Sequence, residues 1–168
     1  MAMTNVYTGA NGTLTLASED TPEGQDAQLV MDTYELQTVG RVTEVKICVQ
    51  NDLEEFHEIG RRHATSLHSG NWHVSGQVGR AYMNGALLQL LMGKGAGPNT
   101  TPEPYVHPTF NMTLALNDPA VPGNTASLEV KGVKFQSWAY ALPEDDFVME
   151  NLAFKALAIR VIDTESSS

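Results

Sequence analysis

The sequence predicts a mainly β fold, an antiparallel β-sandwich or half-open barrel with one short α-helix. Three observations lead to this prediction. Apolar and polar residues alternate with a period of two in three separate segments, 14 glycines and 8 prolines supply turns between short elements, and one segment alone has the composition of a buried helix. Alternating segments with one polar face are typical of antiparallel sheets that have one face in water.

The length of 168 residues and the mass of 18.2 kDa fit one domain of ordinary size. No internal repeat and no linker interrupts the chain. We therefore expect a single domain over residues 1–168, with a flexible tail at about 163–168.

The N-terminal third contains two weaker strand signals. Val6 to Leu16 ends in alternating leucines after an Asn11-Gly12 turn signal, which predicts a short hairpin. The polar stretch from Ala17 to Ala27 contains Pro22 and Gly24 and predicts a loop. Leu29 to Val39 follows as a second predicted strand.

Three segments predict half-buried strands most clearly. In the first, the two faces consist of Thr43, Val45, Ile47 and Val49, and of Glu44, Lys46, Cys48 and Gln50. In the second, Trp72, Val74, Gly76, Val78 and Arg80 alternate with His73, Ser75 and Gln77, and in the third, Phe110, Met112, Leu114 and Leu116 alternate with Asn111, Thr113 and Ala115. The single cysteine, Cys48, excludes an internal disulfide, and its place in a strand predicts a small buried hydrophobe.

The predicted helix begins at Asn84, whose side chain can accept from a free N–H of the first turn, and stops before Gly93. Its leucines surround the axis, so we expect it to be buried under a sheet or against a neighbouring subunit. Lys94 to His107 is rich in Gly and Pro and predicts a loop.

Two features near the C-terminus concern the path of the sheet. The apolar positions change parity from Leu128 and Val130 to Val133 and Phe135, and again to Trp138 and Tyr140, which indicates bulges or a strand that bends from one sheet into another. The run Asn151 to Ile162 is apolar on both parities and predicts one central strand covered on both faces.

Charge and composition exclude several classes of function. Twenty acidic and ten basic side chains give a net charge of −10 without a basic stripe, which excludes a protein that grips nucleic acid. The N-terminus lacks the pattern of a secretory signal and no segment is long enough to span a bilayer, so we expect a soluble chain that is made in the cytoplasm, with no membrane partner.

No pattern predicts catalysis, a cofactor or a metal. The five histidines have no i,i+4 pair and there is one cysteine, so no metal site is expected. Glu54, Glu55 and Glu58 are typical of a solvated face. The glycines around Lys94 follow a helix instead of preceding one, which is the wrong context for a phosphate loop, and no nucleophile elbow is present. The sequence therefore indicates that the protein is not an enzyme.

Several motifs resemble a known family. They are the block Phe56-His57-Glu58-Ile59-Gly60-Arg61-Arg62, then Val74-Ser75-Gly76, Gly79-Arg80-Ala81-Tyr82-Met83-Asn84-Gly85 and Leu87-Leu88, together with the opening VYTGANGTLTLA and the ending VKFQSWAYALPEDDFVMENLAFKALAI. In these motifs the chain resembles the tail tube proteins of long-tailed bacteriophages, especially contractile ones. The same fold serves contractile bacteriocins, extracellular injection systems and the tube of type VI secretion.

The resemblance implies a structural virion protein. Six copies would close a ring with a continuous barrel, and rings would stack into a negatively charged conduit for DNA passage into the host. Implied partners are the chain itself, a sheath if the tail contracts, and tape-measure, baseplate and terminator proteins. DNA would pass without specific binding. The protein would reside in the virion tail after assembly in the cytoplasm of the bacterial host.

Candidate assembly residues follow from the pattern. Leu53, Phe56 and Ile59 lack an evident local core, so we expect them to dock on a neighbouring protomer or ring. Three helix residues, Leu87, Leu88 and Leu91, are further candidates for the subunit interface. A polar strand face predicts lumen-facing residues, namely Glu44, Lys46, Gln50 and Gln77.

Three alternatives to a phage tail tube remain open, besides an enzyme of unknown class, which the missing catalytic constellations disfavour most. One is the tube protein of a phage-derived contractile injection system or bacteriocin. Another is a ring-forming virion protein of the same fold, such as a terminator or tube initiator. A different class is a monomeric β-barrel that binds a small ligand, which its mass in size-exclusion chromatography would distinguish.

Overall fold

The computed structural model describes residues 7–96, 106–117, 120 and 123–164. This part of the chain is mainly β, as predicted, and contains two α-helices. The strands are β1 (Gly12–Ser18), β2 (Val42–Asn51), β3 (Glu54–Phe56), β4 (Ser66–His68), β5 (Trp72–Ala81), β6 (Phe110–Asn117), β7 (Thr125–Ala141), β8 (Met149–Ala156) and β9 (Ala158–Thr164). The helices are α1 (Pro22–Tyr34) and α2 (Ala86–Met92), with 3-10 turns η1 (Gly9–Asn11) and η2 (Gly93–Ala96).

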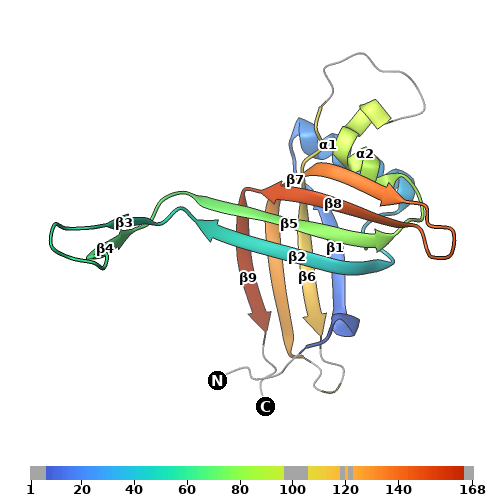
Figure 1. Cartoon of the computed structure of the whole chain (residues 1–168). Helices are drawn as coiled ribbons and strands as arrows, with labels where there is room; N and C mark the ends of the chain where they lie inside the picture. Colours follow the sequence, from blue (N-terminus) through green and yellow to red (C-terminus); the bar gives the residue numbers. More distant parts are fainter. Residues whose placement is uncertain (1–6, 97–105, 118–119, 121–122, 165–168) are drawn as a thin grey trace.

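Seven of these strands form one sheet in the order β1-β6-β7-β8-β5-β2, with β9 also paired to β7. All of its strand pairs are antiparallel. The sheet curls strongly into a half-barrel, so that β2, β5 and β8 cross over β1, β6, β7 and β9 (Figure 1). The half-open barrel predicted from the sequence is confirmed.

The longest strand, β7, belongs to both parts of the curled sheet. Its N-terminal part pairs with β6 and β9, whereas its C-terminal part pairs with β8. Gly132, with φ of 66°, lies between the two parts, and the register with β8 shifts between Phe135 and Ser137. Because a positive φ is accessible to glycine at little cost, Gly132 permits the bend. The parity changes predicted bulges or a bent strand, and β7 shows both, a register shift and a bend between the two parts of the single curled sheet.

The core lies between the two crossing parts of the sheet. Three phenylalanines from β6, β7 and β8 fill its centre, Phe110, Phe135 and Phe154, each at most 1% exposed. The rings of Phe110 and Phe135 lie 5.1 Å apart. Val45, Ile47 and Val49 of β2 pair with Val78, Gly76 and Val74 of β5. This register places the apolar face predicted for both strands toward the core.

The first helix corrects the prediction for residues 17–39. The expected loop and the expected strand from Leu29 to Val39 are wrong, because Pro22–Tyr34 is α1. Thr21 caps this helix by accepting from the Gly24 N–H at 3.0 Å, and Pro22 occupies the first turn. The buried residues Gly24, Ala27, Val30 and Met31 recur at helical spacing. Pro22 and Gly24, taken as loop signals, belong to a helix start.

The second helix was predicted and is confirmed, although its N-cap residue is Gly85, one position after the predicted Asn84. Asn84 Oδ1 accepts from the Ala86 N–H at 3.1 Å, and Gly93 follows the helix with φ of 61°. The two helices lie together at one end of the half-barrel (Figure 1). Gln89 of α2 donates to the Tyr34 hydroxyl of α1 at 2.9 Å. Neither described helix has the length and apolar character needed to cross a bilayer.

Two further expectations are wrong. Tyr7 to Leu16 contains η1 followed by β1, with no hairpin among its described residues. Asn151 to Ile162 is divided between β8 and β9 on either side of Leu157, and β9 pairs with β7 alone. Apolar residues occur on both parities there because the chain leaves one part of the sheet for the other.

Two predicted irregular segments lie partly outside the described residues. Within the loop expected from Lys94 to His107, the described Lys94–Ala96 belongs to η2, and residues 97–105 are not described. Within the expected tail, Asp163 and Thr164 belong to β9, and residues 165–168 are not described.

Candidate assembly surfaces

A long hairpin projects from the half-barrel between β2 and β5. We call residues 52–71 the arm; it contains β3 and β4 and extends well beyond the sheet (Figure 1). At its base, Asn51 Nδ2 donates to Ser69 Oγ at 2.8 Å, and the Gly70 N–H donates to Asn51 Oδ1 at 3.0 Å. His73 and Asp52 pair at 2.8 Å. The arm therefore has a defined path where it leaves the sheet.

The arm presents large apolar side chains to solvent. The candidates Leu53, Phe56 and Ile59 are all exposed, Ile59 fully so, and Leu67 on β4 is exposed as well. The expectation that these side chains lack a local core is confirmed. Because a two-stranded hairpin is marginally stable by itself, contact with another surface would stabilise the arm.

The candidates on α2 occupy different environments. Leu87 is 1% exposed and lies in the core of the chain itself, so its side chain offers a neighbour almost no surface. Leu88 and Leu91 are half-buried, and Leu91 packs against the core. A helix that is apolar on all sides is thus covered in large part by its own chain, and an interface role stays a prediction for Leu88 and Leu91.

The four lumen candidates share one face of the curled sheet. Glu44, Lys46 and Gln50 alternate with the apolar residues of β2 and therefore share one face of the strand. Lys46 pairs with Gln77 of β5, so the four side chains project from the same face, away from the core. All four side chains are exposed. We call this surface of β2, β5, β8 and the C-terminal part of β7 the polar face. The burial predicted for Cys48 is wrong, because Cys48 lies exposed on the polar face opposite Ser75.

The net charge of the polar face is positive, whereas the net charge of the whole chain is negative. Ser75 pairs with Lys155, which in turn pairs with Lys134, so both lysines join Lys46 on this face. Glu44 is the single carboxylate on the described strands of this face, which gives 3 − 1 = +2 against −10 for the chain. The excess acid lies elsewhere, including the arm, α1 and the turn after β7.

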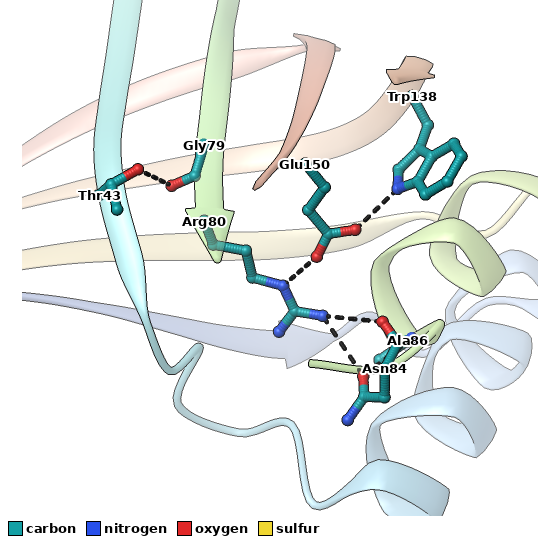
Figure 2. Close-up of polar contacts among 7 residues, drawn as sticks. All are labelled: Thr43, Gly79, Arg80, Asn84, Ala86, Trp138 and Glu150. Carbon is teal, nitrogen blue, oxygen red and sulfur yellow. Dashed lines mark hydrogen bonds and ion pairs between the residues drawn. The ribbon is translucent and has the colours of Figure 1, made fainter. Parts of the chain in front are cut away.

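A buried polar network, not singled out from the sequence, lies where β5 ends. Arg80 and Glu150 are 1% and 0% exposed and form an ion pair through Arg80 Nε and Glu150 Oε1. Trp138 Nε1 donates to Glu150 Oε2 at 2.8 Å, and Arg80 Nη2 donates to the Asn84 carbonyl and side-chain oxygens at 3.4 and 3.3 Å (Figure 2). Because Asn84 Oδ1 also accepts from the Ala86 N–H at the start of α2, this network fixes the helix to β5, β7 and β8. The position of Arg80 in an alternating strand, on the apolar parity, was the signal available in the sequence.

The turn between β7 and β8 is an exposed acidic surface with apolar flanks. Glu144, Asp145 and Asp146 are exposed, and Leu142 and Phe147 beside them are 73% and 81% exposed. Sequence reasoning did not select this turn as a candidate. The consecutive carboxylates between two large apolar residues were the signal that could have found it.

Three described strands lie at an edge of the curled sheet, because β1 pairs with β6 alone, β2 with β5 alone and β9 with β7 alone. Gln37 and Val39 bond to the backbone of β1, whereas no described segment bonds to the outer edge of β2 or β9. Arg160 on β9 pairs with Glu129 on β7, and this hydrogen bond lowers the pKa of the Glu129 carboxyl. A free edge carries unpaired backbone groups that another strand can satisfy.

The open side of the half-barrel contains a groove with a volume of about 880 Å³. It lies between β2 and the crossing strands, and its apolar lining includes Leu14, Val39, Val42, Leu114 and Leu128. No three His, Cys, Asp or Glu side chains of the described chain are grouped as metal ligands. The surfaces described above suit contact with other protein chains.

Comparisons with known proteins identify solved structures that have a similar fold. No family model and no curated protein matches the chain. Among solved structures, a chain of the sheath–tube complex of an extracellular contractile injection system, PVC, in the extended state is 9% identical with a TM-score of 0.62, over 95% of this chain and 93% of that one. A chain of the anti-feeding prophage baseplate is 12% identical with a TM-score of 0.62, over 96% and 97%. The SPP1 tail tube is 10% identical with a TM-score of 0.58, over 96% and 81%.

These likenesses cover almost the whole described chain and establish its fold. The fold is that of chains from phage tails and contractile injection systems. The resemblance to tail tube proteins seen in the sequence is thereby confirmed at the level of the fold.

Proposed function

We propose that this protein builds the inner tube of a phage tail by forming hexameric rings that stack into a hollow tube. The fold shared with the SPP1 tail tube and with the PVC sheath–tube complex carries the proposal. Identities near one residue in ten leave open a tube of a phage-derived injection particle instead of a virus. In either case the role is structural and requires no catalytic group.

The surfaces of the isolated chain support self-assembly. The free edges of β2 and β9 have backbone groups that neighbouring protomers can pair, and closure of a ring removes such edges. The exposed apolar residues of the arm give each copy a projecting contact for a neighbouring protomer or ring. A contact of this head-to-tail kind, repeated around and along an axis, produces rings and filaments.

The polar face of β2, β5, β7 and β8 is the surface proposed to line the lumen. Six copies would carry 6 × −10 = −60 in total, but 6 × +2 = +12 on this face. An acidic wall therefore does not follow from the net charge if this face is lumenal. The acidic residues would then lie at the ends and outer surface of the tube, where they oppose adsorption of DNA.

The sheath, terminator and baseplate complexes among the similar structures suggest the further partners. A tube of this kind would contact a sheath if the tail contracts, a tape-measure protein inside, and terminator and baseplate proteins at its ends. DNA would pass through without specific binding. The location would be the virion tail, assembled in the cytoplasm of the bacterial host.

Negative-stain microscopy of the purified protein tests the proposal. Long tubes of constant width support it, whereas single rings favour a terminator or a tube initiator. A monomeric mass in size-exclusion chromatography at high concentration would contradict self-assembly. That result would favour a ligand-binding barrel, for which the groove of about 880 Å³ is the available site.

The variant Phe56→Asp tests the role of the arm. Because Phe56 is 53% exposed, lies outside the core and has its ring edge to face with that of His68 in the arm, the substitution leaves the core untouched. We expect a folded protein, with the circular dichroism of the wild type, that no longer forms tubes. Val106→Asp, at a residue that is exposed outside the arm, serves as the matched control and should assemble normally if the effect belongs to the arm. Normal tubes from Phe56→Asp would remove the arm from the assembly contacts.

A further inference from the structure

The arm and the acidic turn project from opposite ends of the same strands. The arm leaves β2 and β5 at Asn51 and Trp72, whereas Ala81, at the other end of β5, pairs with Met149 directly after the β7–β8 turn. The Tyr82 N–H donates to the Val148 carbonyl at 2.9 Å, which extends this pairing into the turn. Figure 1 shows the arm at one side of the half-barrel and the β7–β8 turn at the other. A copy displaced along these strands therefore brings its arm toward the turn of the next copy.

The tip of the arm is basic in an acidic protein. Arg61 and Arg62 are exposed, and within the described chain neither guanidinium forms an ion pair. By contrast, Arg80 and Arg160 pair with Glu150 and Glu129. The fully exposed Ile59 lies two residues before Arg61. The tip thus combines Arg61 and Arg62 with one exposed carboxylate, Glu58, and one large apolar side chain, so that its basic groups outnumber its acidic one.

The β7–β8 turn has the complementary character. Three consecutive carboxylates, Glu144, Asp145 and Asp146, lack an ion pair among the described residues. The Asp146 Oδ1 atom accepts from the Phe147 N–H at 2.7 Å, which orders the turn locally. Leu142 and Phe147, at 73% and 81% exposure, flank the carboxylates. Complementary charges around exposed apolar groups set the register and specificity of a protein contact.

We infer that the tip of the arm docks on the β7–β8 turn of a second copy of this chain in the next layer of the assembly. Arg61 and Arg62 pair with Glu144 and Asp145, and Ile59 packs against Leu142 and Phe147. The contact is heterologous, because one copy gives its arm and the other its turn, and it therefore propagates in one direction. This inference rests on the proposed assembly into stacked rings and names the surface that receives the arm.

Charge reversal on each side tests the contact. The variant Arg61→Glu/Arg62→Glu and the variant Glu144→Arg/Asp145→Arg each place like charges against one another in every contact. We expect each to raise the protein concentration needed for tube formation by about tenfold or more, as measured by sedimentation and negative stain. Asp146 is left unchanged to keep the hydrogen bond within the turn.

Restoration of the tube separates this contact from a general effect of charge. The protein with all four substitutions has an acidic arm and a basic turn, so it should form tubes again. An equimolar mixture of the two double variants should also form tubes, because each arm then meets an opposite charge on the other variant. Asp20→Arg/Glu35→Arg changes the net charge by the same amount as Glu144→Arg/Asp145→Arg and should assemble like the wild type.

The outcomes distinguish this contact from the proposed function. Wild-type tubes together with unimpaired tubes from both double variants would overturn the contact alone. The contact is also overturned if each double variant is folded but tubes return neither in the fourfold variant nor in the mixture. If a reversed variant does not fold, Arg61→Gln/Arg62→Gln replaces it and should weaken assembly to a smaller extent. A wild-type protein that stays monomeric would overturn the proposed function, and this contact with it.

Discussion

At the scale of single residues, the buried pair of Arg80 and Glu150 decides how the helices are attached to the sheet. Both charged groups are removed from water, which is costly unless each has partners. Glu150 receives hydrogen bonds from Arg80 and Trp138, and Arg80 also donates to Asn84. The pair is therefore stable as a unit and vulnerable to loss of one member.

We predict that Glu150→Ala lowers the free energy of unfolding by about 3 kcal/mol or more, because it leaves the Arg80 guanidinium buried without a counter-ion. Urea unfolding of monomeric protein measures the loss. Arg80→Met/Glu150→Leu, which removes both charges, should recover much of it. Glu58→Ala, at an exposed carboxylate, is the control and should remain within about 0.5 kcal/mol of the wild type. Equal losses in the single and the double variant would contradict the role of the unpaired charge.

A second prediction at this scale concerns His107. Burial lowers the pKa of its imidazole below the usual 6.5, and Lys134 lowers it further, against the raising effect of the hydrogen bond between Nε2 and the Phe135 carbonyl. The unfolded chain therefore binds a proton at higher pH than the folded chain does. Stability that is present above pH 6.5 is lost as the pH falls through the lower folded-state pKa.

The variant His107→Gln isolates this contribution, since glutamine does not titrate. Between pH 7.5 and about 5, the free energy of unfolding should fall more steeply for the wild type than for His107→Gln. His63→Gln, at an exposed position of the arm, is the control and should retain the slope of the wild type. Parallel slopes for the wild type and His107→Gln would show that His107 does not contribute.

At the scale of elements, local signals predicted those strands whose faces differ in polarity. β2, β5 and β6 each have one apolar and one polar parity, so the period of two identified them. The hydrophobic pattern did not predict α1, because the apolar stripe of this helix is narrow and includes Gly24 and Ala27. Both residues are buried because they are small, and neither adds much to an apolar pattern. β8 and β9 were merged because the chain changes sides of the sheet at Leu157 without a polar turn.

We predict that Thr21→Ala lowers the free energy of unfolding by about 1 kcal/mol, because it removes the acceptor for the Gly24 N–H at the start of α1. Thermal unfolding followed by circular dichroism measures the effect. Thr21→Ser keeps a hydroxyl that can accept the same hydrogen bond and should be close to the wild type. If Thr21→Ser destabilises as much as Thr21→Ala, the cap does not account for the loss.

At the scale of the whole molecule, the surfaces suited to assembly are composed of parts distant in sequence. The polar face joins Lys46 to Lys155 and Lys134 through three strand pairings. The arm and the β7–β8 turn become opposite ends of one body through the pairing of β5 with β8. The net charge of the chain could not reveal either arrangement, because it counts charges without placing them.

The single native cysteine tests which face lines the lumen. Because Cys48 is exposed on the polar face, it should react in dispersed protein both with N-ethylmaleimide and with a maleimide attached to a bulky carrier protein. In assembled tubes we expect the small reagent to react and the bulky one to be excluded, as mass spectrometry would show. Labelling of tubes by both reagents would place the polar face outside. Protection from both would place it in a subunit contact.

The sequence by itself determined the β class, the position of α2, the bend in β7 and the exposed apolar residues of the arm. Each of these depends on neighbours within a few positions, where periodicity and capping operate. Only the tertiary structure decided that Leu87 is covered by its own chain, that Cys48 is exposed and that Arg80 meets Glu150. These outcomes depend on which strands become neighbours, and strand pairing is set by packing across the whole chain, which no local pattern encodes.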